Sequence, residues 1–227
     1  MDSDRHREDR IIASWVGNAA AWRMAVHESR IESRRRVTDR AIVEVVLEES
    51  PASLLDLGCG EGWLCRALSA HGIETVGVDG IAELIGSARD SASGDYRTLT
   101  YDQIAAGDLR LCVDTVVSNF SLLGKQSVER VFQAVPALLG PRGRFIVQTL
   151  HPLEACPDMP YSDGWRSGSW NGCGGGFSDP APWYFRTLDS WIELFTSNGF
   201  RLREIREPCY PQQANPVSII FVSSLRD

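Results

Sequence analysis

The fold of this chain is decided by residues 54–63, which read LLDLGCGEGW. An apolar run over residues 52–57 predicts a short buried strand, and apolar residues recur with helical spacing from Trp63 onward. Three glycines at alternate positions separate the two elements, so the backbone can turn sharply and present bare amide groups to a ligand. We therefore expect Asp56 and the glycines to lie at a ligand site above the carboxyl end of this strand.

Two kinds of nucleotide-binding fold use a glycine-rich turn from strand to helix. The dinucleotide fingerprint places a glycine or alanine three positions after its second glycine, where it packs helix against strand. Here that position holds Trp63, and Asp56 stands just before the turn, where its charge would disfavour a pyrophosphate. The positively charged amino group of an amino-acid-like ligand would instead be attracted to Asp56.

The same residues resemble the first motif of the class I, seven-strand S-adenosylmethionine-dependent methyltransferases, in which an acid precedes glycines at alternate positions. A second strand is expected over residues 75–79, and it ends in Asp79, where either nucleotide fold binds ribose hydroxyls. The resemblance implies a small-molecule methyltransferase with S-adenosyl-L-methionine as its cofactor. An NAD-dependent oxidoreductase and a non-catalytic S-adenosylmethionine-binding regulatory protein are the alternatives.

The composition fits an ordinary globular enzyme. Of the 227 residues, 43% are hydrophobic and 23% are charged, and the net charge of -7 argues against a general nucleic-acid or anionic-membrane surface. We expect a small-molecule substrate, no nucleic-acid or membrane partner, and a monomer or homodimer. The six cysteines include no C-x-x-C pair of the kind found in zinc or redox sites. A polar N-terminus and the lack of an apolar run of about 18 residues indicate a cytoplasmic protein.

Strands and helices alternate along the rest of the chain. Helical spacing predicts two or three helical pieces within residues 1–36 and further helices near residues 37–46, 81–88, 128–139 and 188–197. Strands are expected near residues 96–101, 113–118, 145–150, 200–206 and 218–222, with a turn at residues 140–143. The pattern predicts an α/β fold with a doubly wound, mostly parallel sheet and helices on both faces. The last two strands follow each other directly, which suggests an antiparallel hairpin. The methyltransferase resemblance implies an antiparallel last strand between the fifth and sixth, giving seven strands.

Three parts of the chain have distinct expected roles. Residues 1–50 would form a helical cap over the cofactor site and bring Trp15 or Trp22 towards it, and residues 51–227 would form the methyltransferase domain. Within that domain, residues 151–186 are expected to be a substrate lid. This segment holds six glycines and five prolines, which makes regular structure improbable, but its seven aromatic residues suit a cover over a substrate.

The resemblance implies roles for particular residues of this chain. The methionine part of the cofactor would be held by Asp56, Gly58, Cys59 and Gly60 and its ribose by Asp79. The adenine would be held by Gly80, Ile81 and Asp102, and the carboxylate by Arg34 or Arg35. Asn119 and Phe120, at the end of the fourth strand, would lie where cofactor and substrate meet.

The fourth-strand end also excludes some subfamilies. Residues 118–121 read SNFS, which is neither the Asn/Asp-Pro-Pro-aromatic tetrad of DNA amino-methyltransferases nor an acidic, metal-binding sequence as in catechol-type enzymes, so no metal is expected. His151, at the carboxyl end of the fifth strand, is a candidate general base near neutral pH, unless it only caps the strand end. Tyr161 is a second catalytic candidate, and Arg186 is a candidate substrate contact.

Overall fold

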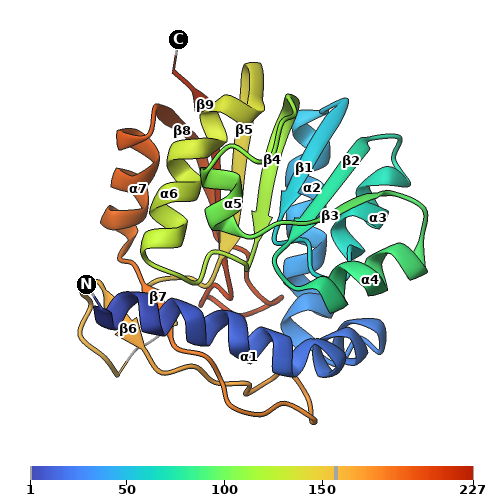
Figure 1. The fold of residues 1–227 in the computed structure, drawn as a ribbon. Helices are drawn as coiled ribbons and strands as arrows, with labels where there is room; N and C mark the ends of the chain where they lie inside the picture. Colours follow the sequence, from blue (N-terminus) through green and yellow to red (C-terminus); the bar gives the residue numbers. More distant parts are fainter. Residues whose placement is uncertain (1, 156–157, 227) are drawn as a thin grey trace.

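The computed structural model describes residues 2–155 and 158–226 and shows one seven-stranded sheet with helices on both faces (Figure 1). The strands lie in the order β3-β2-β1-β4-β5-β9-β8. Their bounds are β1 Ser53–Leu57, β2 Glu74–Asp79, β3 Asp95–Thr98, β4 Val113–Asn119, β5 Leu139–Thr149, β8 Phe200–Arg206 and β9 Ile219–Leu225. Within the described part of this sheet, β9 alone runs opposite to the other six strands, and it lies between β5 and β8. The predicted α/β architecture is therefore confirmed, including the inserted antiparallel strand.

The chain order of the strands reverses between β1 and β4. From β1 the chain moves outward through β2 and β3 and then returns to β4 on the other side of β1. Ligands of open α/β sheets bind at such a reversal, outside the carboxyl ends of the strands. The glycine turn that follows β1 lies at this position.

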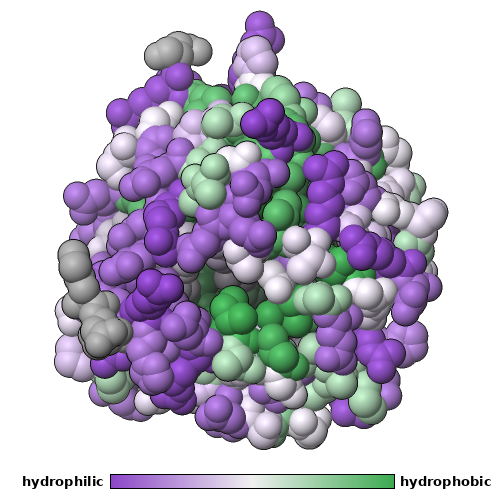
Figure 2. All heavy atoms as spheres, viewed as in Figure 1, coloured by the Kyte–Doolittle hydropathy of each residue, from purple (hydrophilic) through white to green (hydrophobic). Residues whose placement is uncertain are grey.

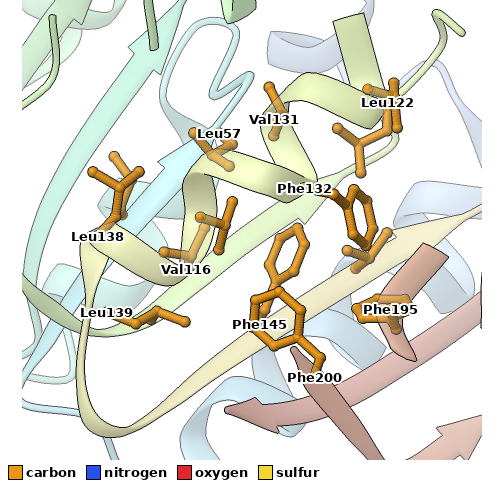
Figure 3. Close-up of a cluster of buried hydrophobic side chains, with 14 of the residues drawn as sticks. Leu57, Val116, Leu122, Val131, Phe132, Leu138, Leu139, Phe145, Phe195 and Phe200 are labelled. Carbon is orange, nitrogen blue, oxygen red and sulfur yellow. The ribbon is translucent and has the colours of Figure 1, made fainter. Parts of the chain in front are cut away.

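Each face of the sheet has its own apolar core. One face packs against α5 (Tyr101–Ala105), α6 (Gln126–Ala134) and α7 (Leu188–Ser197), and the other against α2 (Asp39–Glu49), α3 (Trp63–Ser69) and α4 (Ala82–Ser91). On the first face, the ring of Phe132 lies 4.9 Å from the rings of both Phe145 and Phe195 (Figure 3). Edge-to-face aromatic pairs of this kind add to the stabilisation that burial already provides.

The N-terminal region crosses the carboxyl edge of the sheet. It contains α1 (Asp2–His27) and, after a short break, a π-helix, η1 (Arg34–Thr38), so two helical pieces begin within residues 1–36, as predicted; both Trp15 and Trp22 lie on the first. The stretch contains no proline and a single glycine, Gly17, which costs only about 1 kcal/mol in a helix and does not end it. Figure 1 shows α1 lying across the ends of the strands. Among the described residues, no helix has the length and apolar character needed to cross a bilayer.

Three element boundaries differ from the prediction, each for a local reason. The strand predicted to reach Tyr101 ends at Thr98, because Thr100 forms a capping box with Gln103 that starts α5. The helix predicted over residues 128–139 becomes a 3₁₀ turn, η2 (Val135–Leu138), at Pro136. Residues 140–143 lie within β5 as an irregularity in its pairing with β4, rather than as a turn before it.

The segment 151–186 contains regular structure that was not expected. Two short strands, β6 (Gly164–Arg166) and β7 (Trp183–Phe185), form an antiparallel pair. Trp165 faces Tyr184 across the pair, with 5.5 Å between the ring centroids. Cross-strand aromatic pairs stabilise such ribbons and offset the effect of the glycines and prolines around them.

Candidate functional site

The glycine turn brings β1 close to the end of β4. Gly58 has a φ of +76°, and a Cβ atom added there would lie 2.3 Å from Cβ of Ser121. Only glycine satisfies both conditions. The amides of Gly58 and Cys59 both donate to the carbonyl of Val78, at 2.8 and 3.0 Å, so the turn is fixed to the end of β2.

Asp79 lies directly beside this turn. One of its carboxylate oxygens accepts a hydrogen bond from the amide of Gly60 at 2.9 Å, and the other accepts from the amide of Ile81 at 2.8 Å. Desolvation raises the pKa of Asp79, and the two amide hydrogen bonds oppose that effect. The structure thus brings together three predicted cofactor residues from two neighbouring strand ends.

Asp56 is a buried acid with almost no compensation. It is 1% exposed, and within the part of the chain that the structure describes Oδ1 has no hydrogen-bond partner and Oδ2 accepts only from the thiol of Cys65, at 3.7 Å. Burial raises the pKa of Asp56 to about 7, and the charges of Asp79 and Glu61 add to that increase. A cationic group at Oδ1 would relieve this unfavourable electrostatic situation.

Arg34 and Arg35 differ sharply in position. Arg35 is exposed, whereas Arg34 is buried with its guanidinium 4.8 Å from the ring of Trp63 and 5.5 Å from that of Trp22. Nε of Arg34 donates to Asp39 at 2.9 Å, while Nη1 and Nη2 are buried and have no hydrogen-bond partner among the residues that the structure describes. The two free groups are suited to a carboxylate, which a guanidinium binds through paired hydrogen bonds.

Helix α1 places both tryptophans beside residues that were predicted to bind the cofactor. Nε1 of Trp22 lies 3.5 Å from the position that a Cβ of Gly60 would take. Trp15 and Trp22 pack against an apolar group that includes Ile81. Gly80 lies between Asp79 and Ile81, with Thr100 as its nearest neighbour outside that strand.

The ends of β4 and β5 form a second polar region. Asn119 pairs with Gln148 in the parallel register, and each has a buried amide oxygen for which the described residues supply no hydrogen-bond partner. Phe120 has a φ of +54°, a strained value for a residue with a side chain, and its amide donates to the carbonyl of Gln148 at 2.8 Å. Gln148 was not predicted from the sequence, although a glutamine in the apolar stretch FIVQTL was a signal that could have found it.

Alternation along the strands places these amides on the α2 side of the sheet. Val117 and Ile146, two residues before Asn119 and Gln148, both belong to the core packed against α2. The amide of Gln148 also donates to Oγ of Ser218, which precedes β9, at 3.0 Å. The π-helix that carries Arg34 leads directly into α2, so both polar regions lie on the side of the sheet that η1 and α2 cover.

His151 lies two residues beyond β5 and is 3% exposed. Its Nε2 is 2.8 Å from Oε1 of Glu207, and its buried Nδ1 has no hydrogen-bond partner among residues 2–155 and 158–226. Glu207 follows β8 and was not predicted as a functional residue. The structure therefore gives His151 an acidic partner from a different strand end.

Three other predicted residues make contacts within the protein. The hydroxyl of Tyr161 accepts from the amide of Leu188 at 2.8 Å, at the start of α7. Arg186 is buried and donates to the carbonyls of Gly124 and Lys125 at 3.0 and 2.9 Å. Asp102 is exposed and forms an ion pair with Arg130 at 2.8 Å, on the α6 side of α5.

The segment 151–186 is attached to α1. Asn18 makes two hydrogen bonds with the backbone of Ser178, both at 2.8 Å, and Trp15 packs against Trp170 with 5.4 Å between ring centroids. Nε1 of Trp165 donates to Asp4 at 2.8 Å. Figure 2 shows that the surface seen from the side of Figure 1 is largely hydrophilic, with hydrophobic residues gathered around a hollow near its centre.

Buried polar atoms without partners are concentrated at this one edge. Among the described residues there are nine such side-chain atoms, and all except Nε of Arg166 belong to the glycine turn, the strand ends, η1 or His151. An unsatisfied buried polar group costs about 1–3 kcal/mol, so protein interiors rarely contain a cluster of them. The cluster therefore has the character of a binding site for a polar ligand.

Comparisons with known proteins agree with this arrangement. A family model described as "Methyltransferase domain" matches residues 30–205. The ubiquinone biosynthesis O-methyltransferase of Bradyrhizobium diazoefficiens is 33% identical over 103 residues, covering 43% of this chain and 40% of that protein. The corresponding protein of Sinorhizobium medicae is 31% identical over 104 residues, covering 43% of this chain and 41% of that protein. The chain thus matches less than half the length of these relatives.

Two solved structures show the same fold. The magnesium protoporphyrin IX methyltransferase of Synechocystis with bound SAH covers 96% of this chain and 100% of its own, with a TM-score of 0.68 and 17% identity. An S-adenosylmethionine-dependent methyltransferase from Mesorhizobium loti covers 81% of this chain and 96% of its own, with a TM-score of 0.63 and 21% identity. Since the family model also spans most of the sequence, the chain belongs to the methyltransferase-domain family, with the class I, S-adenosylmethionine-dependent fold that its first motif resembles.

Proposed function

We propose that this protein binds S-adenosyl-L-methionine at the glycine turn and transfers its methyl group to an oxygen or nitrogen atom of a small molecule. The proposal rests on two buried side chains of opposite charge, Asp56 and Arg34. Oδ1 of Asp56 and both Nη atoms of Arg34 have no hydrogen-bond partner among the described residues. Asp56 lies two residues before Gly58, the first glycine of the turn, and Arg34 stacks on Trp63, which follows the turn.

An amino-acid group carries one ammonium and one carboxylate, and these two sites complement both. Oδ1 of Asp56 is suited to accept from the ammonium, and the two Nη groups of Arg34 are suited to donate to the carboxylate. NAD has no such zwitterion, so the pair favours S-adenosylmethionine over the dinucleotide alternative. Gly58, Cys59 and Gly60 would then lie along the methionine chain, while the exposed Arg35 would make no contact.

The nucleoside half of the cofactor fits the end of β2. The two carboxylate oxygens of Asp79, each of which accepts from one backbone amide, would also accept from the two ribose hydroxyls, and Gly80 and Ile81 would offer an apolar surface to the adenine. The predicted hydrogen bond from the adenine amino group to Asp102 would require that side chain to leave Arg130.

S-adenosylmethionine supplies an activated methyl group when it is bound, so the protein needs mainly to orient the acceptor and exclude water. The strand ends with Asn119 and Phe120 are where we place the acceptor. Helix α1 and the segment 151–186 cover that edge and are held together by Asn18 and Ser178. We propose that they act as cofactor cap and acceptor lid.

The finer biological setting is also part of this proposal. A net charge of -7 favours a small-molecule acceptor over nucleic acid. Cys59 and Cys65 are free thiols that pack together under the glycine turn, which suits a reducing, cytoplasmic compartment. We place the protein there as a monomer or homodimer.

Calorimetry with S-adenosylmethionine, its demethylated product SAH and NAD tests the cofactor assignment. We expect both sulfur compounds to bind in a one-to-one ratio and NAD not to bind. Two charge-assisted hydrogen bonds contribute about 2–5 kcal/mol together, so Asp79→Ala should weaken binding by well over tenfold. The matched control is Asp90→Ala, which removes an exposed carboxylate from α4. Equal affinities for the two variants would contradict the role of Asp79, and binding without turnover on any acceptor would favour the non-catalytic alternative.

A further inference from the structure

One pair of titratable side chains at the cofactor edge has no place in cofactor binding. His151 follows β5 and Glu207 follows β8, and they are 56 residues apart in the chain. Nε2 of His151 and Oε1 of Glu207 are 2.8 Å apart. The imidazole is 3% exposed, whereas the carboxylate side chain is 57% exposed.

The topology explains why these two residues meet. Strand β9 is antiparallel to both β5 and β8, so β5 and β8 run in the same direction and their carboxyl ends lie at the same edge of the sheet. His151 and Glu207 therefore form a bridge across the start of β9, at the edge where the glycine turn also lies.

The hydrogen bond to Glu207 determines what the imidazole can do. A carboxylate can only accept, so Nε2 carries a hydrogen and donates it. In a neutral imidazole the other nitrogen, Nδ1, then keeps its lone pair. Nδ1 of His151 is buried and accepts no hydrogen bond from any described residue. A histidine that only capped the strand end would be expected to use both nitrogens, because leaving one unpartnered is unfavourable in a buried position.

The surroundings of His151 connect it to the acceptor region. It lies three residues beyond Gln148, which pairs with Asn119 in the register of β4 and β5; neither residue's amide oxygen has a hydrogen-bond partner among the described residues. On the other side, Arg36 of η1 stacks on Tyr210, three residues after Glu207, with 4.9 Å from the guanidinium to the ring centroid. The loop that carries Glu207 is thus packed against the helix that covers the polar edge.

We propose that Glu207 positions His151 as the general base of an oxygen methylation, so that the acceptor of this protein is a hydroxyl compound. Nδ1 takes the proton of the acceptor hydroxyl while the oxygen forms its bond to the methyl carbon and the bond from that carbon to sulfur breaks. The sulfonium becomes a neutral thioether. The proton, held on the imidazole beside the Glu207 carboxylate, is then released to solvent. This inference rests on the proposed function, because it requires a bound methyl donor.

The experiment measures methylation of three probes: catechol, 4-nitrocatechol, which is more acidic and is already ionised near neutral pH, and aniline. General bases contribute about 10²–10⁴-fold, so His151→Ala should lower turnover of catechol by at least about 100-fold. Turnover of 4-nitrocatechol should fall far less, because its proton is already lost. Glu207→Gln keeps an accepting oxygen but lacks the charge that stabilises the imidazolium, and it should lower catechol turnover about tenfold, with KM unchanged. Glu193→Gln, which removes an exposed carboxylate on α7, is the matched control.

Two further measurements separate the possible failures. Calorimetric binding of SAH to each variant reports on folding and on the cofactor site, and we expect unchanged affinity. ¹⁵N NMR of the histidines should show His151 with hydrogen on Nε2 and none on Nδ1. The proposal is overturned by hydrogen on Nδ1, by equal losses on catechol and 4-nitrocatechol, or by a wild-type protein that methylates aniline and neither catechol. A wild-type protein that fails to bind SAH would instead refute the proposed function.

Discussion

Replacing Asp56 with asparagine should stabilise the protein while weakening its hold on the cofactor. Asp56 is 1% exposed; in the described residues its Oδ1 has no hydrogen-bond partner, and the only hydrogen bond to Oδ2 comes from the thiol of Cys65. Two further acids, Asp79 and Glu61, raise its pKa in addition to the effect of burial. Asparagine has nearly the same shape and removes the charge.

The pKa of Asp56 sets the size of the effect and its dependence on pH. It is about 7 in the folded protein, against about 3.9 for an aspartate in an unfolded chain, and a difference of about three corresponds to about 4 kcal/mol. The folded-state value is the higher one, so the folded chain keeps a proton that the unfolded chain loses between about pH 4 and 7. The cost of the buried charge is therefore absent below about pH 4 and complete above about pH 7.

The expected gain is smaller than this full cost. The amide of asparagine would itself be buried with incomplete hydrogen bonding, at a cost of about 1–3 kcal/mol. The free energy of unfolding of Asp56→Asn should therefore exceed that of the wild type by about 1–3 kcal/mol at pH 8. At pH 5 most of this difference should be gone.

Urea unfolding at pH 5 and pH 8, without cofactor, measures the difference in stability, and calorimetry measures S-adenosylmethionine binding. A loss of at least tenfold in affinity is expected, since a neutral amide cannot pair with the ammonium. Asp90→Asn on α4 is the control and should change neither quantity. If Asp56→Asn is less stable than the wild type at pH 8, the carboxylate has a favourable partner and the reasoning fails.

Other changes test the cap and the core. Arg34→Met should weaken cofactor binding by more than tenfold in calorimetry, while Arg35→Met should leave it unchanged, because only Arg34 has free, buried Nη groups. Asn18→Ala removes both hydrogen bonds to Ser178 and should increase hydrogen exchange at the amide of residue 178, whereas unchanged exchange would show that the lid is held by other contacts. Phe132→Ala should lower the free energy of unfolding by about 3–5 kcal/mol in urea, and a loss below about 1 kcal/mol would mean that the three-ring cluster is not tightly packed.

The parts of the fold that were predictable are those that short stretches of sequence specify. The glycine turn, Asp56 and the end of β2 are read from local apolar runs and glycine spacing, and the structure has them as predicted. The sequence left Arg34 and Arg35 as equal alternatives. The structure separates them, because Arg34 is buried between Ile31 and Val37, which are also buried, whereas Arg35 is exposed.

The parts that were not predictable depend on which strand ends meet in space. Glu207 contacts His151 only because β9 is inserted between β5 and β8, and Ser218 contacts Gln148 for the same reason. No spacing in the sequence encodes either pair. The aromatic pairing of Trp165 with Tyr184 likewise overrides a composition that argued against regular structure.

The stabilising and the destabilising residues of this chain occupy different parts of the sheet. Buried aromatic side chains around Phe145 lie on the α6 and α7 face, where burying each side chain contributes about 1.5–3 kcal/mol. The uncompensated charge of Asp56 and the free Nη groups of Arg34 lie at the carboxyl edge. A domain has only about 5–15 kcal/mol of net stability, so the buried charges of Asp56 and Arg34 are tolerable only because the aromatic core stabilises the fold. The groups that weaken the protein on its own are those that the zwitterion of the cofactor would compensate. Part of the binding energy should therefore appear as stabilisation of the folded state. We expect S-adenosylmethionine to raise the Tm of the wild type, and to raise the Tm of Asp56→Asn by much less.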